Sequence, residues 1–243
     1  SSVGTTGPLP PNITLPHPRA TWDEYKRRSK ADKGPEDSKE KAQGLIDTEV
    51  ELIEIPKGSS AFNMVNQKFS RESGSFCLVK LEAIKSPIRY GAYMYKREVF
   101  REELGKFLNE QWLWHGTSEK IVLNIAHQGF LRQFLGSATD YGFYGCGIYF
   151  APNAGTSCSY ARAGSDGLRR MLLCRVLVGQ YHKGYQGLKQ PKAKPGSKYK
   201  PHECTVDNVY NPSEYVIYQD DQAYPEFLLT FTTNCSRMGT GFL

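Results

Sequence analysis

Four places in this chain carry side chains of types that could bind or transform a ligand. An imidazole and a carboxylate can hold hydroxyl groups and move protons, and tyrosine rings can stack on a flat ligand. These places are His115-Gly116 after the run "WLW", Tyr149 in "GIYFA" after the glycine-rich "DYGFYGCG", Ser157 with Tyr160, and Glu214 at the start of "EYVIY".

Taken one at a time, each of these groups also has a plain structural interpretation. A histidine at a strand end is usually structural, and a tyrosine in an apolar strand usually belongs to the core. A glutamate that opens a strand is usually a solvated edge charge, and clustered glycines usually mark a turn or bulge. A functional interpretation therefore requires that several of them act together.

In combination, these motifs resemble the catalytic domain of the poly(ADP-ribose) polymerase family, the diphtheria-toxin-like ADP-ribosyltransferases. That family carries a histidine in an HG(S/T) strand, a tyrosine in a G(I/T)YF strand, and a glutamate that opens a late strand before YPE(Y/F)L. This chain has, in the same order, "HGT" at His115, "GIYFA" at Tyr149, and Glu214 ahead of "QAYPEFLLTF". The resemblance covers roughly residues 48 to 233. It implies an enzyme that transfers ADP-ribose from NAD+ and releases nicotinamide.

The resemblance implies three catalytic residues. Cleavage of the bond between nicotinamide and ribose passes through an oxocarbenium-like state, which a nearby carboxylate stabilises. Glu214 is expected to bind the 2′-hydroxyl of the nicotinamide ribose and to help activate the attacking group. His115 is expected to act as a hydrogen-bond donor to the 2′-hydroxyl of the adenosine ribose. Tyr149 is expected to stack on the nicotinamide ring.

The remaining NAD+-binding residues implied by the resemblance fall into two groups. On the nicotinamide side, Gly116 is expected to offer its backbone to the carboxamide, Ser157 to add a hydroxyl, and Tyr160 to stack on the ring. No metal is expected to take part, and nicotinamide-like inhibitors are expected to bind.

On the adenosine side, residues 131 to 147 are expected to form a loop over the donor pocket. Arg132 in that loop is expected near the adenine or pyrophosphate. Thr117 is expected to contact the adenosine side or, alternatively, to hydrogen-bond the backbone at the strand end. The expected NAD+-binding set also includes Phe150 and Ala151.

The periodicity of apolar residues predicts the elements that position these side chains. Alternation with a period of two predicts strands over residues 48–56 and 75–84. Further strands are expected over residues 111–115, 147–151, 169–181, 214–219 and 226–233. Helical spacing predicts helices over 59–70, 86–106 and 118–129. A serine is expected to cap the first of these helices, and Ser118 and Gly129 are expected to begin and end the third. The helix over 86–106 is expected to bury Ile88, Ala92, Tyr95 and Val99.

This order of elements predicts an α+β protein, because the helices cluster early and do not alternate regularly with strands. The resemblance further implies two packed, mainly antiparallel sheets around an NAD+ cleft, with flanking helices. Residues 1–43 contain few large apolar groups, so we expect a flexible N-terminal flank. Residues 44–233 are then the catalytic domain, and residues 234–243 a C-terminal tail.

Charge and cysteine content set broader limits. The formal net charge of +6 favours an anionic ligand but does not identify a nucleic-acid binder. The six cysteines are scattered, with no C-x-x-C pair, which is typical of reduced thiols in an intracellular protein of the cytoplasm or nucleus. The sequence contains neither a recognisable secretory signal nor a membrane-length apolar run, so no membrane association is expected.

The sequence leaves the product and the acceptor open. Glu214 is typical of polymer-forming members, whereas "RVLVGQY" and "TVDNVYNPS" resemble the macrodomain-linked mono-ADP-ribosylating branch, which usually replaces this glutamate. We expect transfer to protein acceptors, the enzyme itself among them, with some elongation to poly(ADP-ribose). The alternatives are mono-ADP-ribosylation only, a catalytically silent NAD or ADP-ribose binding module, and transfer to nucleic acid.

The stretch from Lys183 to His202 contains six lysines and no acidic residue. It could attract the pyrophosphate of an incoming ADP-ribose, an acidic protein or a nucleic acid, or it could be an ordinary solvated loop. The zinc motif of the tankyrases and the regulatory helical domain of DNA-dependent members are not recognisable in this sequence.

Overall fold

The strands form two β-sheets in the computed structural model, which describes residues 50–134, 142–233 and 235. The predicted flank 1–43 and most of the predicted tail 234–243 lie outside these residues. Within the described ranges the strands are β1 (Glu51–Glu54), β2 (Cys77–Lys85), β3 (Glu110–Gly116), β4 (Ile148–Phe150), β5 (Arg169–Leu177), β6 (Tyr181–Lys183), β7 (Cys204–Val206), β8 (Tyr215–Ile217) and β9 (Ala223–Thr232).

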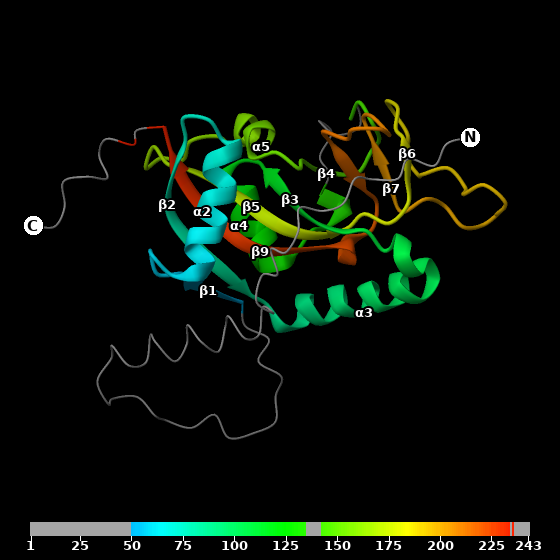
Figure 1. The fold of residues 1–243 in the computed structure, drawn as a ribbon, viewed down its shortest axis with the longest axis horizontal. Coiled ribbons are helices and arrows are strands. Elements are labelled where there is room, and N and C mark those ends of the chain that lie inside the picture. Colours follow the sequence, from blue (N-terminus) through cyan, green and yellow to red (C-terminus); the bar gives the residue numbers. More distant parts are fainter. Residues whose placement is uncertain (1–49, 135–141, 234, 236–243) are drawn as a thin grey trace, which may run out of the picture.

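The larger sheet has the strand order β1-β2-β9-β5-β3, and every neighbouring pair in it is antiparallel. The smaller sheet has the order β4-β8-β7-β6, in which only β6 and β7 run parallel. Figure 1 shows the smaller sheet at the end of the molecule away from the C-terminus. The predicted α+β class with two mainly antiparallel sheets is confirmed.

Four α-helices and three short 3-10 helices connect the strands in the described ranges. The α-helices are α2 (Ser60–Glu72), α3 (Pro87–Leu104), α4 (Glu119–Gln128) and α5 (Ala154–Tyr160), and the 3-10 helices are η1 (Gly105–Phe107), η2 (Arg132–Phe134) and η4 (Asp220–Gln222). The Ser59 hydroxyl accepts from the Phe62 amide and caps α2, as predicted. Ser118 and Gly129 bound α4 as predicted, although Ser118 caps it without a side-chain hydrogen bond.

The larger sheet is buried on both faces. On one face, α2, α3 and α5 pack on it through Phe69, Tyr93 and Cys158. On the other face, α4 and the smaller sheet enclose a second apolar cluster that includes Val122 and Ile217. Strands β5 and β9 run through the middle and contribute to both clusters, which explains their nearly continuous apolar sequences.

The predicted buried stripe of α3 was wrong. Ile88 is 50 % exposed and Tyr95 75 % exposed, whereas the buried side is formed by Tyr90, Tyr93 and Phe100. The rings of Tyr90 and Tyr93 pack against Tyr224 of β9. The helix carries two stripes with helical spacing, and the aromatic contacts with the sheet decide which one is buried.

Three short elements differ from the prediction. Helix α5 was not predicted, although the Asn153 side chain caps it by accepting from the Gly155 amide. Strands β6 and β7 were also missed, because each has three residues and they pair with each other across a long loop. The strand predicted over 169–181 ends at Leu177, and the chain turns at Gly179 with a positive φ of 59° before β6.

The prediction that all cysteines are reduced thiols was also wrong. Cys77 at the start of β2 forms a disulfide with Cys235, and their Cα atoms are 5.6 Å apart. The remaining four cysteines form no disulfide in the described part of the chain. The disulfide ties the segment after β9 to the strand beside it, a link that joins residues 158 positions apart.

A buried network of charges lies between α3 and the larger sheet. Glu226 of β9 is 1 % exposed and forms an ion pair with Arg175 of β5. Glu110 lies 3.6 Å from Arg175, pairs with Arg97 at 2.6 Å, and accepts from the Tyr93 hydroxyl at 2.8 Å. Burial raises the pKa of Glu226 to about 7, although Arg175 acts in the opposite direction.

We expect the Glu226 carboxyl to make stability depend on pH. Its folded pKa lies above the ordinary value, so its contribution is fully present below about pH 4.5 and is lost as the pH rises through about 7. The native chain should therefore gain up to about 3 kcal/mol relative to Glu226→Gln between pH 8 and pH 5. Urea unfolding of both proteins across this range measures the difference, and parallel stability curves would contradict the expectation.

Candidate active site

Strand β3 presents His115 because alternate residues of a strand face opposite sides of the sheet. Trp114 points to the helical face, where it is fully buried, and Leu113 and His115 point to the other face. Trp114 also exchanges two backbone hydrogen bonds with Ala151, at 2.8 and 2.9 Å, directly after β4. This bridge joins the two sheets and brings the end of β3 beside β4.

The His115 ring lies between aromatic residues and is held by one hydrogen bond. Its centroid is 5.2 Å from that of Phe130 and 5.4 Å from that of Phe150. Its Nδ1 lies 2.8 Å from the carbonyl oxygen of Tyr149. A carbonyl can only accept, so Nδ1 carries the hydrogen and donates it.

Burial lowers the pKa of His115 below its ordinary value, against the opposing effect of the Tyr149 carbonyl. At neutral pH the ring is therefore uncharged, and its Nε2 bears a lone pair. Nε2 can accept a hydrogen bond but cannot donate one. The sequence predicted a donor at this position, whereas the free ring nitrogen of this tautomer is an acceptor; the contact of His115 with a ribose hydroxyl stays a prediction.

Gly116 ends β3 at a point of very close contact. A Cβ at this position would lie 1.9 Å from the carbonyl oxygen of Ser157 in α5, so no other residue fits without a backbone shift. Ser157 is 4 % exposed, and its hydroxyl makes no hydrogen bond within the described ranges. The missing side chain of Gly116 thus allows α5 to pack against β3 and brings the Ser157 backbone beside the strand end.

Tyr149 lies in the middle of β4, opposite Val216 of β8. Its hydroxyl accepts from the Tyr144 amide at 3.0 Å and donates to the Gly145 carbonyl at 2.8 Å. These bonds hold the glycine-rich turn against the strand. Burial, with a smaller contribution from the charge of Glu214, raises the pKa of Tyr149 to about 12, so its hydroxyl stays protonated.

Glu214 directly precedes β8 and is half-buried. Its amide donates to Asp207 Oδ1 at 3.0 Å, and its carboxylate has no hydrogen bond or ion pair with other described residues. Burial and then the charge of Asp207 raise the pKa of Glu214. Although burial opposes it, the hydroxyl and amide of Ser213 and the Glu214 amide hold the pKa of Asp207 below its ordinary value.

The remaining predicted site residues differ in how far they are exposed to solvent. Tyr160 ends α5 with its side chain 59 % exposed, and Thr117 is half-buried just after β3. Phe150 and Ala151 are buried at 2 % and 3 % exposure. Phe150 packs on His115 and Ala151 forms the bridge to β3, so both support the site from within the core.

Arg132 forms contacts within the protein. Its guanidinium donates to the carbonyl oxygens of Cys146 and Lys189, at 3.3 and 2.5 Å, and lies over the ring of Tyr218. Its amide donates to Asp220 at 2.7 Å. These contacts join three loops, which is a structural role; contact with adenine or pyrophosphate stays a prediction. Much of the predicted loop over the donor pocket, residues 135–141, lies outside the described residues.

Glu72 at the end of α2 supports the site and was missed by sequence reasoning. One carboxylate oxygen accepts from the Trp114 indole at 2.6 Å and from the Ala154 amide at 3.1 Å. The other oxygen pairs with Lys68 at 2.7 Å. The carboxylate therefore links α2 to the residue before His115 and to the first residue of α5. Its position just beyond the predicted helix 59–70 carries no signal for this role.

The resemblance implies NAD+ as the ligand of this site, and we expect Glu72→Leu to raise its KM about tenfold or more, because small displacements of binding groups are costly. Glu72→Gln should restore most of the affinity, since an amide oxygen can accept the same two hydrogen bonds. Glu98→Leu, which removes an exposed carboxylate on α3, is the matched control. Steady-state kinetics measure the KM, and thermal melts measure stability. A Glu72→Leu protein that is less stable but keeps the native KM would contradict a positioning role.

No group of three or more histidine, cysteine, aspartate or glutamate residues in the described ranges could hold a metal ion. The helices of the same ranges include none that is long and apolar enough to cross a membrane.

Comparison with known proteins agrees with the geometry. Residues 59–233 match the model of the poly(ADP-ribose) polymerase catalytic domain. The human protein mono-ADP-ribosyltransferase PARP14 is 33 % identical over 183 residues, which cover 74 % of this chain and 10 % of that protein. Mouse mono-ADP-ribosyltransferase PARP10 is 31 % identical over 194 residues, covering 77 % and 20 %. A probable poly(ADP-ribose) polymerase of Dictyostelium discoideum is 29 % identical over 203 residues, covering 76 % and 53 %. The chain therefore spans between a tenth and about half of these relatives.

Proposed function

Because this chain belongs to the family of poly(ADP-ribose) polymerase catalytic domains, we propose that it transfers ADP-ribose from NAD+ to protein acceptors, with itself among them. The observation that carries the proposal is the bridge between Trp114 of β3 and Ala151 just after β4, together with the pairing of β4 with β8, which supports a common site for His115, Tyr149 and Glu214.

In this proposal the chain's own residues bend and orient the dinucleotide. His115 Nε2 accepts a hydrogen bond from the 2′-hydroxyl of the adenosine ribose, since its Nδ1 hydrogen is already used by Tyr149. Gly116 pairs its backbone with the nicotinamide carboxamide, and the Ser157 hydroxyl adds a further contact. Tyr149 and Tyr160 stack on the nicotinamide ring. Fixing the ring and both riboses exposes C1′ to one direction of attack.

Glu214 performs the electrostatic part of the reaction. The bond between C1′ and the nicotinamide nitrogen breaks, and its electron pair leaves with neutral nicotinamide. The ribose becomes oxocarbenium-like, and the Glu214 carboxylate, bound to the 2′-hydroxyl, stabilises the positive charge. A nucleophile of the acceptor protein then bonds to C1′, and Glu214 helps to remove its proton.

The decisive experiment follows labelled NAD+. Incubation with adenylate-labelled NAD+ should release nicotinamide and label the enzyme and added protein. Absence of nicotinamide release would overturn the transferase proposal in favour of a silent binding module, and label on added nucleic acid alone would overturn protein transfer.

We also propose some elongation of the product, and Glu214 supports it because polymer-forming members keep this residue. The printed names of PARP14 and PARP10 describe mono-ADP-ribosyltransferases. Gel analysis distinguishes the two outcomes: a ladder of labelled product supports elongation, and a sharp band contradicts it while leaving the transfer itself intact.

Tyr160→Ala should weaken nicotinamide-like inhibitors about 3- to 10-fold, because it removes one stacking face. The exposed ring of Tyr160 can be deleted without opening the core. Tyr95→Ala removes a similarly exposed tyrosine on α3 and serves as the control. Isothermal titration with such an inhibitor measures the change, and equal affinities for the native and Tyr160→Ala proteins would exclude Tyr160 from the stack.

An intracellular location, in the cytoplasm or nucleus, is part of the proposal. Microscopy of the tagged protein with compartment markers tests it.

A further inference from the structure

The stretch from Lys183, the last residue of β6, to the start of β7 forms a basic surface beside the smaller sheet. Figure 1 shows it extending from the end of the molecule that lies away from the C-terminus. Its lysines do not all face solvent as free charges: Lys194 forms an ion pair with the buried Glu203, and Lys200 lies 3.8 Å from Glu103. The other four have no ion pair in the described part of the chain and are exposed. They are Lys183, Lys189, Lys192 and Lys198.

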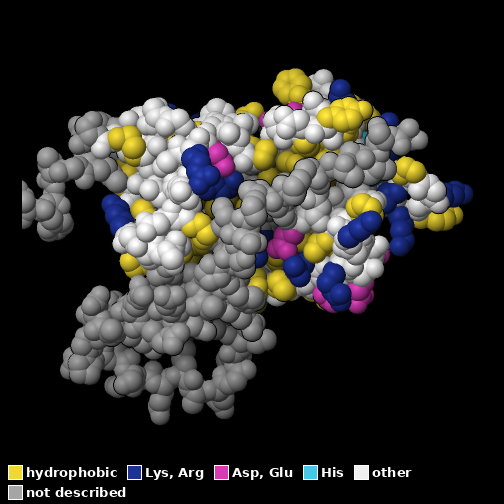
Figure 2. All heavy atoms as spheres, viewed as in Figure 1, with side chains coloured by type: hydrophobic (Ala, Val, Ile, Leu, Met, Phe, Trp, Pro, Cys, Tyr) yellow, Lys and Arg dark blue, Asp and Glu magenta, His cyan; other side chains and the backbone are white. Residues whose placement is uncertain are grey.

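Exposed tyrosine rings lie among these ammonium groups. Tyr185 is 49 % exposed, with the Lys192 ammonium 5.3 Å from its ring centroid. Tyr199 is 83 % exposed, with the Lys198 ammonium 5.5 Å from its centroid. Figure 2 shows lysine or arginine side chains next to hydrophobic ones at this end of the molecule. A large aromatic ring that is left in water beside a cation offers both a stacking face and a phosphate-binding charge.

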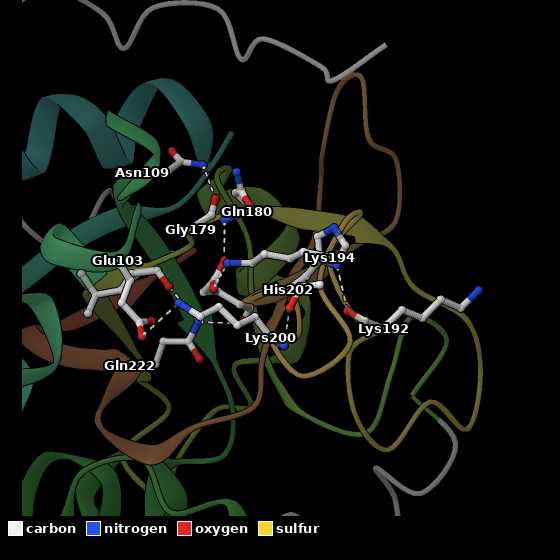
Figure 3. A network of polar contacts seen from close by, with 12 residues as sticks. Glu103, Asn109, Gly179, Gln180, Lys192, Lys194, Lys200, His202 and Gln222 are labelled. Carbon is white, nitrogen blue, oxygen red and sulfur yellow. Dashed lines mark hydrogen bonds and ion pairs between the residues drawn. The ribbon is translucent and has the colours of Figure 1, made fainter. Parts of the chain in front are cut away.

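The surface stands on a rigid base. Figure 3 shows the network beneath it, in which Lys194 reaches inward to Glu203. Glu203 Oε2 accepts from the Gln180 amide at 2.9 Å, and Gln222 donates at 2.8 Å to the carbonyl oxygens of Glu203 and Leu177. The Lys194 amide donates to the Lys200 carbonyl oxygen at 2.8 Å and closes the turn between these two residues. The backbone that carries the exposed groups is therefore already ordered before binding.

Two histidines fix the backbone of Lys192. The Lys192 amide donates to His182 Nε2 at 3.0 Å, and the Lys192 carbonyl lies 2.8 Å from His202 Nδ1. The two imidazole rings pack edge to face with centroids 4.9 Å apart. These contacts fix the point at which the Lys192 side chain leaves the backbone beside Tyr185.

We propose that this lysine–tyrosine surface, formed by Lys183, Tyr185, Lys189, Lys192, Lys198 and Tyr199, binds single-stranded nucleic acid. Phosphates would pair with the ammonium groups, and unpaired bases would stack on the two tyrosine rings. An acidic peptide would use only the charges and leave the rings without a function. A duplex keeps its bases stacked on each other and cannot use the rings either.

The surface is connected to the candidate active site through the backbone. The Cys146 amide, just before β4, donates to the Leu188 carbonyl at 2.8 Å, and Arg132 donates to the Lys189 carbonyl. A nucleic-acid strand bound to the lysine–tyrosine surface would lie beside the smaller sheet, in which Tyr149 lies on β4 and Glu214 directly precedes β8. The inference does not depend on the proposed transferase reaction, because it concerns binding alone.

The test is fluorescence anisotropy with a fluorescein-labelled 20-nucleotide single-stranded RNA of mixed sequence at several salt concentrations. We expect saturable binding to the native chain. Replacing Lys189, Lys192 and Lys198 by glutamine should weaken binding at least tenfold and reduce the slope of log K against log salt by about 2. The control variant replaces Lys57, Lys96 and Lys106 by glutamine, which removes the same number of charges from other parts of the surface. It should change the affinity for the RNA less than threefold.

The double variant Tyr185→Ala, Tyr199→Ala isolates stacking from charge. It should bind the RNA about 5-fold or more weakly with an unchanged salt slope. A duplex of equal length and a polyglutamate chain of equal charge should bind the native protein more weakly than the single strand. The inference would be overturned if the surface lysine variant and the control lysine variant lost RNA affinity equally, or if the tyrosine double variant kept the native affinity. It would also be overturned if polyglutamate bound the native protein as tightly as the RNA does. Thermal melts of every variant separate loss of the surface from loss of the fold.

Discussion

Glu214→Gln should lower kcat for ADP-ribose transfer about 10²- to 10³-fold while leaving the KM for NAD+ within about threefold of the native value. The amide keeps the size of the side chain and can still hydrogen-bond a hydroxyl, but it carries no negative charge to stabilise the oxocarbenium-like ribose. Release of nicotinamide from labelled NAD+ measures the rate, and inhibitor titration measures binding. Native turnover in this variant would refute the proposed role of Glu214.

The same carboxyl should limit activity in acid. Burial and the Asp207 charge raise the pKa of Glu214, so protonation removes its charge at a higher pH than for a solvated glutamate. The acid limb of kcat/KM should shift to lower pH in Asp207→Asn, which keeps an acceptor for the Glu214 amide but removes the neighbouring charge. An acid limb that stays in place would assign it to another group.

Gly116→Ala is expected to have the second-largest effect. The added Cβ would lie 1.9 Å from the Ser157 carbonyl oxygen, an atom of the backbone that no side-chain rotation can move. Strand β3 and helix α5 must then separate, which displaces His115 and Ser157 together. We expect a loss of about 2 to 3 kcal/mol in stability and of at least tenfold in kcat/KM.

Gly91→Ala provides the matched control. Gly91 is an exposed residue of α3, and a Cβ there would meet no atom within 4 Å. Alanine favours the helix over glycine by up to about 1 kcal/mol, so this variant should be as stable as the native chain or more so. Chemical unfolding and NAD+ kinetics of both variants give the comparison. A Gly116→Ala protein with native stability and native kcat/KM would show that the close contact does not matter.

Helix α3 shows where local pattern stops being informative. Two sets of apolar residues recur at helical spacing along it, one with Ile88 and Tyr95 and one with Tyr90 and Tyr93. Spacing alone does not rank them. The ring of Tyr224, far along the chain, and the carboxylate of Glu110, on the strand after the helix, contact only the second set. The buried side of a helix is thus chosen by the surface on which it packs.

Predictions for the site depended on combining distant motifs. The strands around His115, Tyr149 and Glu214 could be predicted from their short apolar sequences, and the fold class from the order of elements. Their association came from the resemblance, since no local property of one motif points to the others. The hydrogen-bonding direction of His115 could not be obtained from sequence, because it depends on the carbonyl that the β3–β4 bridge places beside Nδ1.

The amino-acid sequence therefore determined the types and order of the elements and the chemical character of the candidate residues, since these follow from short-range periodicity and from side-chain chemistry. The tertiary structure decided which groups meet. It placed Glu72 against Trp114 and Ala154, the Ser157 carbonyl in the space beside Gly116, and a buried Glu203 beneath the lysine–tyrosine surface. Each of these contacts joins residues separated by other elements, and burial of the two apolar cores on either side of the larger sheet is what brings them together.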